Sequence, residues 1–389
     1  MTRCIFNPEH DLCIADGRED YIPPASAVEF GEQGRWIERF MGQGEEIVPW
    51  GWNRVLRKRL QQEGIPTDLL PDDSVLDMLR RNSRRELAVE LLGRLYGMEA
   101  CASSRSRICR MLTPDYRVVA GSLVEIKEFL EEKRRVVLKA PLSGSGKGIR
   151  FVTGELTESD CGWCRRILER QGTVVVEERL EVVQELAMLF EYEMRPVAVV
   201  ADSGIMEPVA GDCGAGDVEV SFKGYSLFYA FNGTYRGNLL ASNEYMENLL
   251  RQWIPVEVLE RVRCGVERFL KEKLQGGGLQ EGDPQESALQ ERVQQEMELK
   301  ESDPQGKDGL RGFVGVDQFI CMRKDGEQLF YNPAVEINLR MTMGHIARNI
   351  YDRHSAEFGL GEGTHCFEPL RGIFPCGREA VAADKIGSV

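Results

Sequence analysis

The sequence predicts a protein that mixes α/β and α+β architecture and contains more than one domain. Strand-like and helix-like segments alternate through the first part of the chain, whereas strand-like segments dominate from residue 185 onward. The chain has 389 residues, which is more than a single hydrophobic core usually fills. Hydrophobic residues make up 42% of it, which is an ordinary share for a folded protein. We therefore expect several domains, each with its own core.

Composition and turn signals divide the chain into four segments. We expect a small α/β domain at residues 1–82, two α+β subdomains at 83–184 and 185–370, and a tail at 371–389. Residues 275–309 are rich in Gln, Glu, Gly and Asp and contain few aliphatic residues. This composition is typical of a flexible surface insertion rather than of a packed element.

The first domain is predicted from two short apolar runs and two amphipathic segments. The predicted strands are 4–6 and 46–52, and the predicted helices are 31–42 and 53–63. Asn7, His10 and Asp11 follow the first strand. They are candidates to face a substrate, but we interpret them as turn and cap residues.

The two following subdomains are predicted in the same way. Helices are expected at 83–96, 123–133, 157–171, 244–252, 256–274 and 342–355. Strands are expected at 118–120, 135–139, 149–153, 172–180, 185–192, 196–202, 204–209, 222–232 and 233–238, with a hairpin of 315–321 and 328–339. Ser83, followed by Glu86 three residues later, has the form of a capping box and indicates where the first of these helices begins.

Charge and the amino terminus restrict the functional class. The formal net charge is −14, which argues against a nucleic-acid-binding surface but is compatible with a local basic pocket for a nucleotide. Residues 1–9 contain no apolar signal-peptide core, and no run of about 18 apolar residues occurs. We therefore expect a cytoplasmic protein without a membrane partner.

The cysteines do not indicate a redox or zinc centre. There are eleven, an odd number, and we expect them to be reduced thiols. Cys161 and Cys164 have the spacing of a redox pair, but no second pair follows, and they lie at the start of a predicted helix rather than after a buried strand. We reject redox or zinc chemistry for them.

The segment 332–344 predicts a strand that ends in functional groups. Aliphatic residues alternate there with Glu336, Asn338 and Arg340, so these three polar side chains share one strand face. Carboxylate and amide oxygens are ligands that Mg²⁺ accepts, and an arginine can neutralise a phosphate or carboxylate. The predicted hairpin would bring Asp317 beside them. The alternative is an amphipathic hairpin whose polar face is simply solvated.

A glycine-rich loop joins two predicted strands. It consists of Ser143, Gly144, Ser145, Gly146, Lys147 and Gly148. Glycines let backbone N–H groups approach phosphate oxygens. The spacing fits neither a Walker A loop nor a dinucleotide-binding fingerprint, because the glycines alternate and a strand follows. We interpret the loop as a flap over a nucleotide; an ordinary hairpin turn is the alternative.

Two further charged positions accompany this loop. Lys139 ends the preceding strand and can reach phosphates as a point charge, although a lone lysine on an edge strand is usually solvated. Glu177 and Glu178 end an apolar strand, as in a hinge that binds the adenine or ribose of a nucleotide. That signal is weak alone, because many strands end in charges.

Taken in chain order, these elements resemble the ATP-grasp superfamily over about residues 84–352. The resemblance implies a small N-terminal pre-ATP-grasp domain and two subdomains that hold ATP between them. It implies two Mg²⁺ ions bound by Asp317, Glu336 and Asn338. Many members carry an early lysine that reaches ATP; here Arg84 and Arg85 stand at the matching helix start, and we name Arg84 as the nucleotide contact.

The resemblance also implies an activity. Family members usually phosphorylate a carboxylate with ATP, after which an amine or thiol attacks the acylphosphate. We therefore expect a carboxylate–amine or carboxylate–thiol ligase that uses ATP and Mg²⁺, with Lys139 and Arg340 as catalytic residues and a small molecule or peptide as substrate. A small-molecule kinase on the same fold and a non-catalytic nucleotide-binding module are the alternatives. The sequence identifies neither the substrate nor the oligomeric state.

Overall fold

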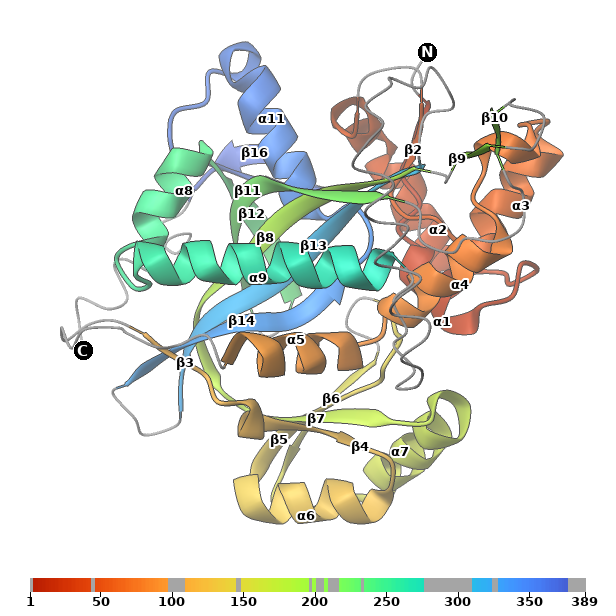
Figure 1. Ribbon diagram of the computed structural model, residues 1–389. Coiled ribbons are helices and arrows are strands. Elements are labelled where there is room, and N and C mark those ends of the chain that lie inside the picture. The colour runs from red at the N-terminus through yellow and green to blue at the C-terminus, as the bar shows by residue number, and fades with distance from the viewer. Residues whose placement is uncertain are drawn as a thin grey trace.

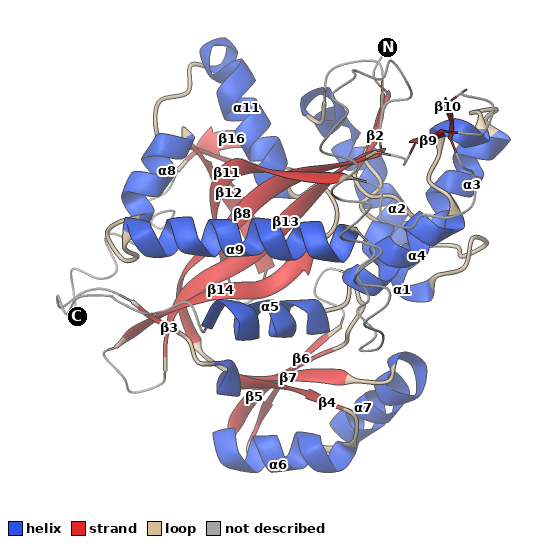
Figure 2. Cartoon of the chain, in the orientation of Figure 1, coloured by secondary structure: helices blue, strands red, loops and turns tan. Residues whose placement is uncertain are grey.

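The structure is a computed structural model. It describes residues 3–42, 46–96, 109–144, 148–195, 198–200, 206–208, 217–231, 234–275, 310–323 and 328–376. Most of the expected insertion, the loop residues Ser145, Gly146 and Lys147, and the tail from residue 377 therefore lie outside the described residues. Helices and sheets are both abundant, so the predicted mixed fold class is confirmed (Figures 1 and 2).

The amino-terminal segment is mainly helical. Its two parallel strands are β1 (Arg3–Ile5) and β2 (Ile47–Pro49). Its helices are α1 (His10–Asp16), α2 (Ala25–Gly34), α3 (Arg54–Gln62) and α4 (Asp73–Asn82), with 3-10 turns η1 (Arg35–Phe40) and η2 (Thr67–Leu69). The predicted first strand and both predicted helical regions are present, whereas α1 and α4 are helices that we did not predict. His10 and Asp11, which we interpreted as turn and cap residues, lie in the first turn of α1.

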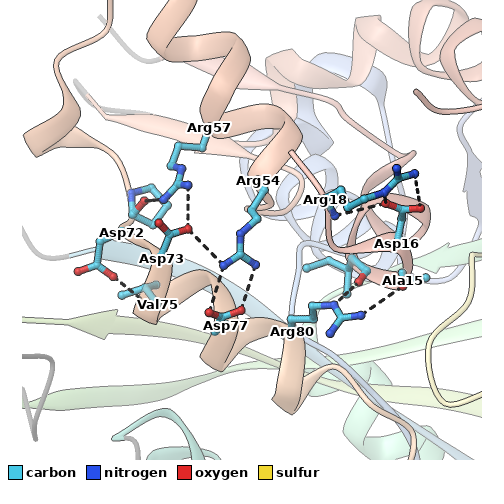
Figure 3. Close-up of polar contacts among 12 residues, drawn as sticks. Ala15, Asp16, Arg18, Arg54, Arg57, Asp72, Asp73, Val75, Asp77 and Arg80 are labelled. Carbon is cyan, nitrogen blue, oxygen red and sulfur yellow. Dashed lines mark hydrogen bonds and ion pairs between the residues drawn. The ribbon is translucent and has the colours of Figure 1, made fainter. Parts of the chain in front are cut away.

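Ion pairs fix the helices of this segment to one another. Figure 3 shows Arg54 of α3 donating to both oxygens of Asp77 of α4, at 3.0 and 3.1 Å. Arg57 donates to Asp73 at 2.9 Å, and Arg80 of α4 donates from Nε to the Ile14 carbonyl of α1 at 2.9 Å. These contacts hold α1, and with it the residues after β1, against α4.

A small antiparallel sheet forms the second part of the fold. In the order β4-β7-β5-β6 its strands are β4 (Arg117–Ala120), β7 (Val174–Glu178), β5 (Arg135–Lys139) and β6 (Ile149–Thr153). The helices α6 (Leu123–Lys133) and α7 (Glu158–Gln171) pack on one face, and the 3-10 turn η3 (Pro114–Tyr116) precedes β4 (Figure 1). The bounds of α6, β5 and β6 are those predicted.

A large sheet of eight strands, in the order β16-β15-β12-β11-β8-β13-β14-β3, forms the centre of the molecule. Its strands are β3 (Arg110–Met111), β8 (Glu181–Met194), β11 (Val218–Phe231), β12 (Thr234–Leu240), β13 (Leu310–Met322), β14 (Leu329–Asn338), β15 (His365–Glu368) and β16 (Gly372–Pro375). A separate pair is β9 (Ala198–Val200) with β10 (Met206–Pro208).

Helices cover both faces of this sheet. Alternate β8 residues such as Leu186, Met188 and Phe190 share a core with α5 (Glu86–Tyr96), α8 (Asn243–Leu250) and α9 (Val256–Leu274). The intervening residues face α11 (Met343–Phe358), as the close approach of Gly344 to Leu189 shows. Figure 1 shows α9 lying across the large sheet and α5 beside β14. Among the described residues, no helix is long and apolar enough to cross a membrane.

Three sequence-based expectations need correction. Ser83 does not cap α5, because its hydroxyl donates to the Leu79 carbonyl at 2.7 Å and so closes α4. Not all cysteines are reduced, because Cys366 and Cys376 form a disulfide. Residues 372–375, expected in the tail, form β16. In each case a long-range or preceding partner decided the structure, and local spacing did not reveal that partner.

Exchanging Gly93 for Ala tests the position of α5. This exposed helical glycine has nothing within 4 Å of where a Cβ would lie, so Gly93→Ala is expected to raise the unfolding free energy by roughly 0.5–1 kcal/mol. Gly172 has equal space but a φ of 85°, so Gly172→Ala is expected to lower it by about 1 kcal/mol. Urea unfolding of both variants is the measurement; stabilisation by both would contradict the assigned backbone conformations.

Candidate nucleotide and metal site

Asp317, Glu336 and Asn338 meet on the β13–β14 hairpin. In the antiparallel register Asp317 lies opposite Glu336, and Gly315 lies opposite Asn338. The Asn338 amide donates from Nδ2 to Asp317 Oδ2 at 3.0 Å. The predicted pairing of the two strands is therefore confirmed, and the three oxygen-bearing side chains lie close together.

The electrostatics of this cluster favour a bound cation. Burial, together with the Glu336 charge, raises the pKa of Asp317 to about 7, against the opposing effects of Arg340 and the Asn338 hydrogen bond. Among the described residues, no group of three or more His, Cys, Asp or Glu side chains is placed to hold a metal. Two carboxylates and one amide nevertheless fit Mg²⁺, which keeps several positions for water and phosphate oxygens.

Arg85 connects this cluster to the glycine-rich loop. Its guanidinium donates to the Ser143 hydroxyl at 2.7 Å and to the Ala140 carbonyl, and it forms an ion pair with Glu336 at 2.9 Å. The backbone N–H of Arg85 also donates to Pro141 O at 3.0 Å. The side chain is only 6% exposed, so these bonds replace water around a buried charge. One arginine therefore joins the small sheet to the strand that carries Glu336.

Arg84 lies elsewhere. Its guanidinium donates to Glu86 and to the Gln171 carbonyl, at 2.6 and 2.8 Å, and it also contacts Thr173. Of the two adjacent arginines, Arg85 is the one that reaches the loop and the carboxylates. Sequence reasoning left both open and named Arg84, because no local signal distinguishes two neighbouring arginines at a helix start.

Lys139 and Glu177 face each other within the small sheet. Lys139 Nζ lies 2.6 Å from Glu177 Oε2, and Arg117 Nη1 lies 3.6 Å from Oε1 of the same carboxylate. All three side chains are buried. Two cations thus share one anion, which leaves an excess positive charge suited to phosphate oxygens. Glu178 instead pairs with Arg323 of the large sheet, at 3.5 Å.

A Cβ would be crowded at both described glycines of the loop. A Cβ on Gly148 would overlap the Ser143 side chain, and a Cβ on Gly144 would lie 2.7 Å from Leu12 Cδ2. Gly148 therefore lies against Ser143, which binds Arg85, and Gly144 lies against α1. Ser145, Gly146 and Lys147 lie outside the part of the chain that the structure describes.

Arg340 is held by the amino-terminal segment. It donates to both oxygens of Asp11, at 2.7 Å from Nε and 3.0 Å from Nη2. Burial raises the pKa of Asp11, but the Arg340 charge and hydrogen bond outweigh it and lower the pKa overall. Sequence reasoning gave Asp11 only a local role; the two residues are 329 positions apart, and no short-range pattern connects them.

These groups surround a small cavity. Its volume is about 30 Å³, which is room for about two water molecules. The lining residues are His10, Asp11, Ile14, Ser83, Arg85, Pro141, Leu142, Ser143, Glu336, Ile337, Asn338, Leu339 and Arg340. Ser143 of the loop, Glu336 and the arginines Arg85 and Arg340 therefore line one cavity. Asp317, Lys139 and Glu177 are not among its lining residues.

Gly51→Ala tests the packing behind this hollow. A Cβ at Gly51 would lie 2.5 Å from Nδ1 of buried His10, whose neighbour Asp11 holds Arg340. We expect the variant to lower the unfolding free energy by about 1–3 kcal/mol, because neither residue has room to move. Urea unfolding measures it, and Gly121→Ala, whose Cβ would meet only Glu125 at 3.9 Å, is the control. Equal stability of both variants would contradict the packing.

His345 predicts a pH dependence of stability. Its Nδ1 accepts from the Thr342 N–H and its Nε2 donates to Phe190 O, both at 3.2 Å, so the neutral ring uses both nitrogens. Burial lowers its pKa from 6.5 to about 4. As the pH falls, His345 therefore becomes protonated in the unfolded chain before it does so in the folded one. Its contribution to stability is full above pH 6.5 and is lost as the pH falls toward 4.

The measurement is the unfolding free energy of wild type and His345→Gln at several pH values. The difference between them isolates His345 from Asp317, whose raised pKa acts in the opposite direction. We expect wild type to lose on the order of 2–3 kcal/mol relative to the variant between pH 6.5 and 4. Parallel pH profiles would contradict a neutral His345 in the native state.

Comparison with known proteins gives only distant similarity. No protein-family model matches the chain. No curated protein matches it either. Solved structures are similar at low level: N5-carboxyaminoimidazole synthetase from Staphylococcus aureus complexed with ADP has a TM-score of 0.34 and 12% identity, over 98% of this chain and 77% of that one.

Two other solved structures give similar values. D-alanyl-alanine synthetase A from Vibrio cholerae has a TM-score of 0.36 and 13% identity, over 90% of this chain and 92% of that one. N5-carboxyaminoimidazole ribonucleotide synthetase from Thermus thermophilus has a TM-score of 0.34 and 14% identity, over 93% of this chain and 79% of that one. Similarities this low establish no function for this chain, so its function has to be argued from its own site.

Proposed function

We propose that the chain is an ATP-grasp enzyme that joins a carboxylate to an amine, or to a thiol, through an acylphosphate. One observation carries the proposal. Arg85 bonds to Ser143 of the glycine-rich loop and to Glu336 of the carboxylate cluster, so the segments expected to bind phosphates and metal belong to one site. A solvated hairpin and an ordinary turn would have no reason to share a buried arginine.

The nucleotide would lie between the small sheet and the β13–β14 hairpin. Lys139 and Arg117 supply positive charge beside Glu177, and Ser143 with the glycine-rich loop offers hydrogen-bond donors to phosphates. Asp317, Glu336 and Asn338 would hold Mg²⁺, which when bound offsets the charge of the β- and γ-phosphates. Arg85 would then neutralise phosphate oxygens beside that cluster.

The remaining groups suit transfer of the γ-phosphoryl group of ATP to a carboxylate. A carboxylate oxygen attacks the γ-phosphorus, the bond to the β-phosphate oxygen breaks, and ADP leaves. An amine then attacks the acyl carbon, inorganic phosphate leaves and the amine loses a proton. Arg340 lines the same hollow and would offset charge on the transferred group. Asp11 fixes its direction through two hydrogen bonds.

The test is a coupled assay for ADP release with panels of carboxylates, run with and without hydroxylamine. An acylphosphate reacts with hydroxylamine to give a hydroxamate, so a carboxylate that gives both ADP and hydroxamate supports the proposal. ADP release with a phosphorylated alcohol and no hydroxamate would instead identify a small-molecule kinase. Nucleotide binding without turnover on any panel would favour a non-catalytic module.

A further inference from the structure

A second cavity lies on the same face of the large sheet, under α11. Its volume is about 220 Å³. Leu189, Glu191, Lys223 and Phe313 line it from the sheet, and His345, Arg348, Asn349, Asp352 and Arg353 line it from the helix. The helical residues stand at positions i, i+3, i+4, i+7 and i+8, so they form one face of α11. The two cavities share no lining residue.

The charges around this second cavity do not cancel. Lys223 pairs with Glu191 at 2.9 Å, and Arg348 pairs with Asp352 at 2.6 Å. Arg353 forms no ion pair or hydrogen bond with another described residue, and His345 is neutral because both ring nitrogens are engaged. The lining therefore carries one net positive charge.

Arg348 lines the cavity from α11 and is held in place by the protein. It is 8% exposed, and its Nη1 donates to the Ala241 carbonyl at 3.1 Å. Its Nε has no hydrogen-bond partner among the described residues. This Nε is buried from solvent, so a ligand in the cavity would contact the two Nη atoms, whose direction the bonds to Ala241 and Asp352 fix.

We propose that this cavity binds a small organic carboxylate. The oxyanion group would be recognised by Arg348, Lys223 and Arg353, and a short apolar body would pack on Leu189 and Phe313. The cavity is about seven times as large as the first one, which is room for a small organic molecule. The two cavities have no lining residue in common, so the site is separate from the proposed catalytic site. Leu189 lies two residues, or about 7 Å, along β8 from Ala187, which is the strand partner of Asp317.

Calorimetric titration of the full chain with butyrate is the test, with inorganic phosphate as a second probe. We expect butyrate to bind at one site with a Kd on the order of 1–10 mM. Lys223→Gln and Arg353→Gln are each expected to weaken binding about 5- to 10-fold, because each removes a charged donor. Both variants leave the Arg348–Ala241 contact intact, whereas replacing Arg348 itself would also disturb folding.

The matched control is Arg251→Gln, which removes an exposed arginine at the end of α8 and is expected to leave affinity unchanged. Arg340→Gln locates the probe, because loss of binding in that variant would place butyrate in the first cavity and overturn the proposal. Absence of butyrate binding, binding of phosphate alone, or unchanged affinity in both Lys223→Gln and Arg353→Gln would overturn it as well. Competition between phosphate and butyrate would support it and show that the oxyanion group dominates recognition.

Discussion

Replacing Glu336 with glutamine is expected to reduce ATP turnover about 100-fold or more while leaving the protein folded. The variant removes the negative charge that would hold Mg²⁺ against the phosphates. The glutamine oxygen can still accept a hydrogen bond from Arg85, which in the wild type forms an ion pair with Glu336 at 2.9 Å. Asp317 lies opposite in the register, so its pKa is also expected to fall when the neighbouring charge is lost. Steady-state ADP release over a series of Mg²⁺ concentrations is the measurement.

The Mg²⁺ series separates this role from a structural one. Loss of a ligand shifts the Mg²⁺ concentration that gives half-maximal turnover upward, whereas a purely structural carboxylate would not change it. Glu219→Gln is the matched control, because this exposed carboxylate lies on β11, away from the hairpin. Unchanged turnover and unchanged Mg²⁺ dependence in Glu336→Gln would contradict the metal assignment.

Lys139→Met is expected to weaken nucleotide binding about 10- to 100-fold. The substitution keeps the apolar stem on β5 but removes the ammonium that lies 2.6 Å from Glu177. Glu177 retains Arg117 at 3.6 Å, so the carboxylate does not become an unpaired buried charge and the fold is expected to survive. The excess positive charge of the cluster disappears, and with it the attraction for phosphate.

Affinity for a non-hydrolysable ATP analogue measures this effect, with circular dichroism as the check on folding. Lys133→Met is the control in the same subdomain, because Lys133, at the end of α6, pairs with Glu132 and Asp115 rather than with the inner sheet. A misfolded Lys139→Met protein, or one that binds the analogue as tightly as wild type, would assign Lys139 a structural role only.

Much of the fold could be predicted because its signals are local. The period-two patterns at β5, β6 and β14 and the helical patterns at α6 and α9 predicted those elements closely. The turn signal in the sequence at residues 323–327 indicated the hairpin, whose strands pair Asp317 with Glu336. The failure at Ser83 has the same origin. A serine near two helices satisfies the spacing of a cap for either, and only the structure shows that it donates to Leu79.

The site was predicted less completely because its closing contacts are long-range. Arg340 and Asp11 come together only when α1 packs beside the end of β14, and Arg85 reaches Glu336 only because α5 lies against that strand. Arg117 was missed for a related reason. An arginine at the start of a strand is usually solvated, and here β4 pairs with β7 and places it beside buried Glu177.

Calorimetric titration of the wild-type chain with a non-hydrolysable ATP analogue, with and without Mg²⁺, tests the central claim most directly. A nucleotide site built from Lys139, the glycine-rich loop and the Asp317–Glu336–Asn338 cluster predicts one site whose affinity rises when Mg²⁺ is added. Absence of binding under both conditions, or binding that is indifferent to Mg²⁺, would contradict it.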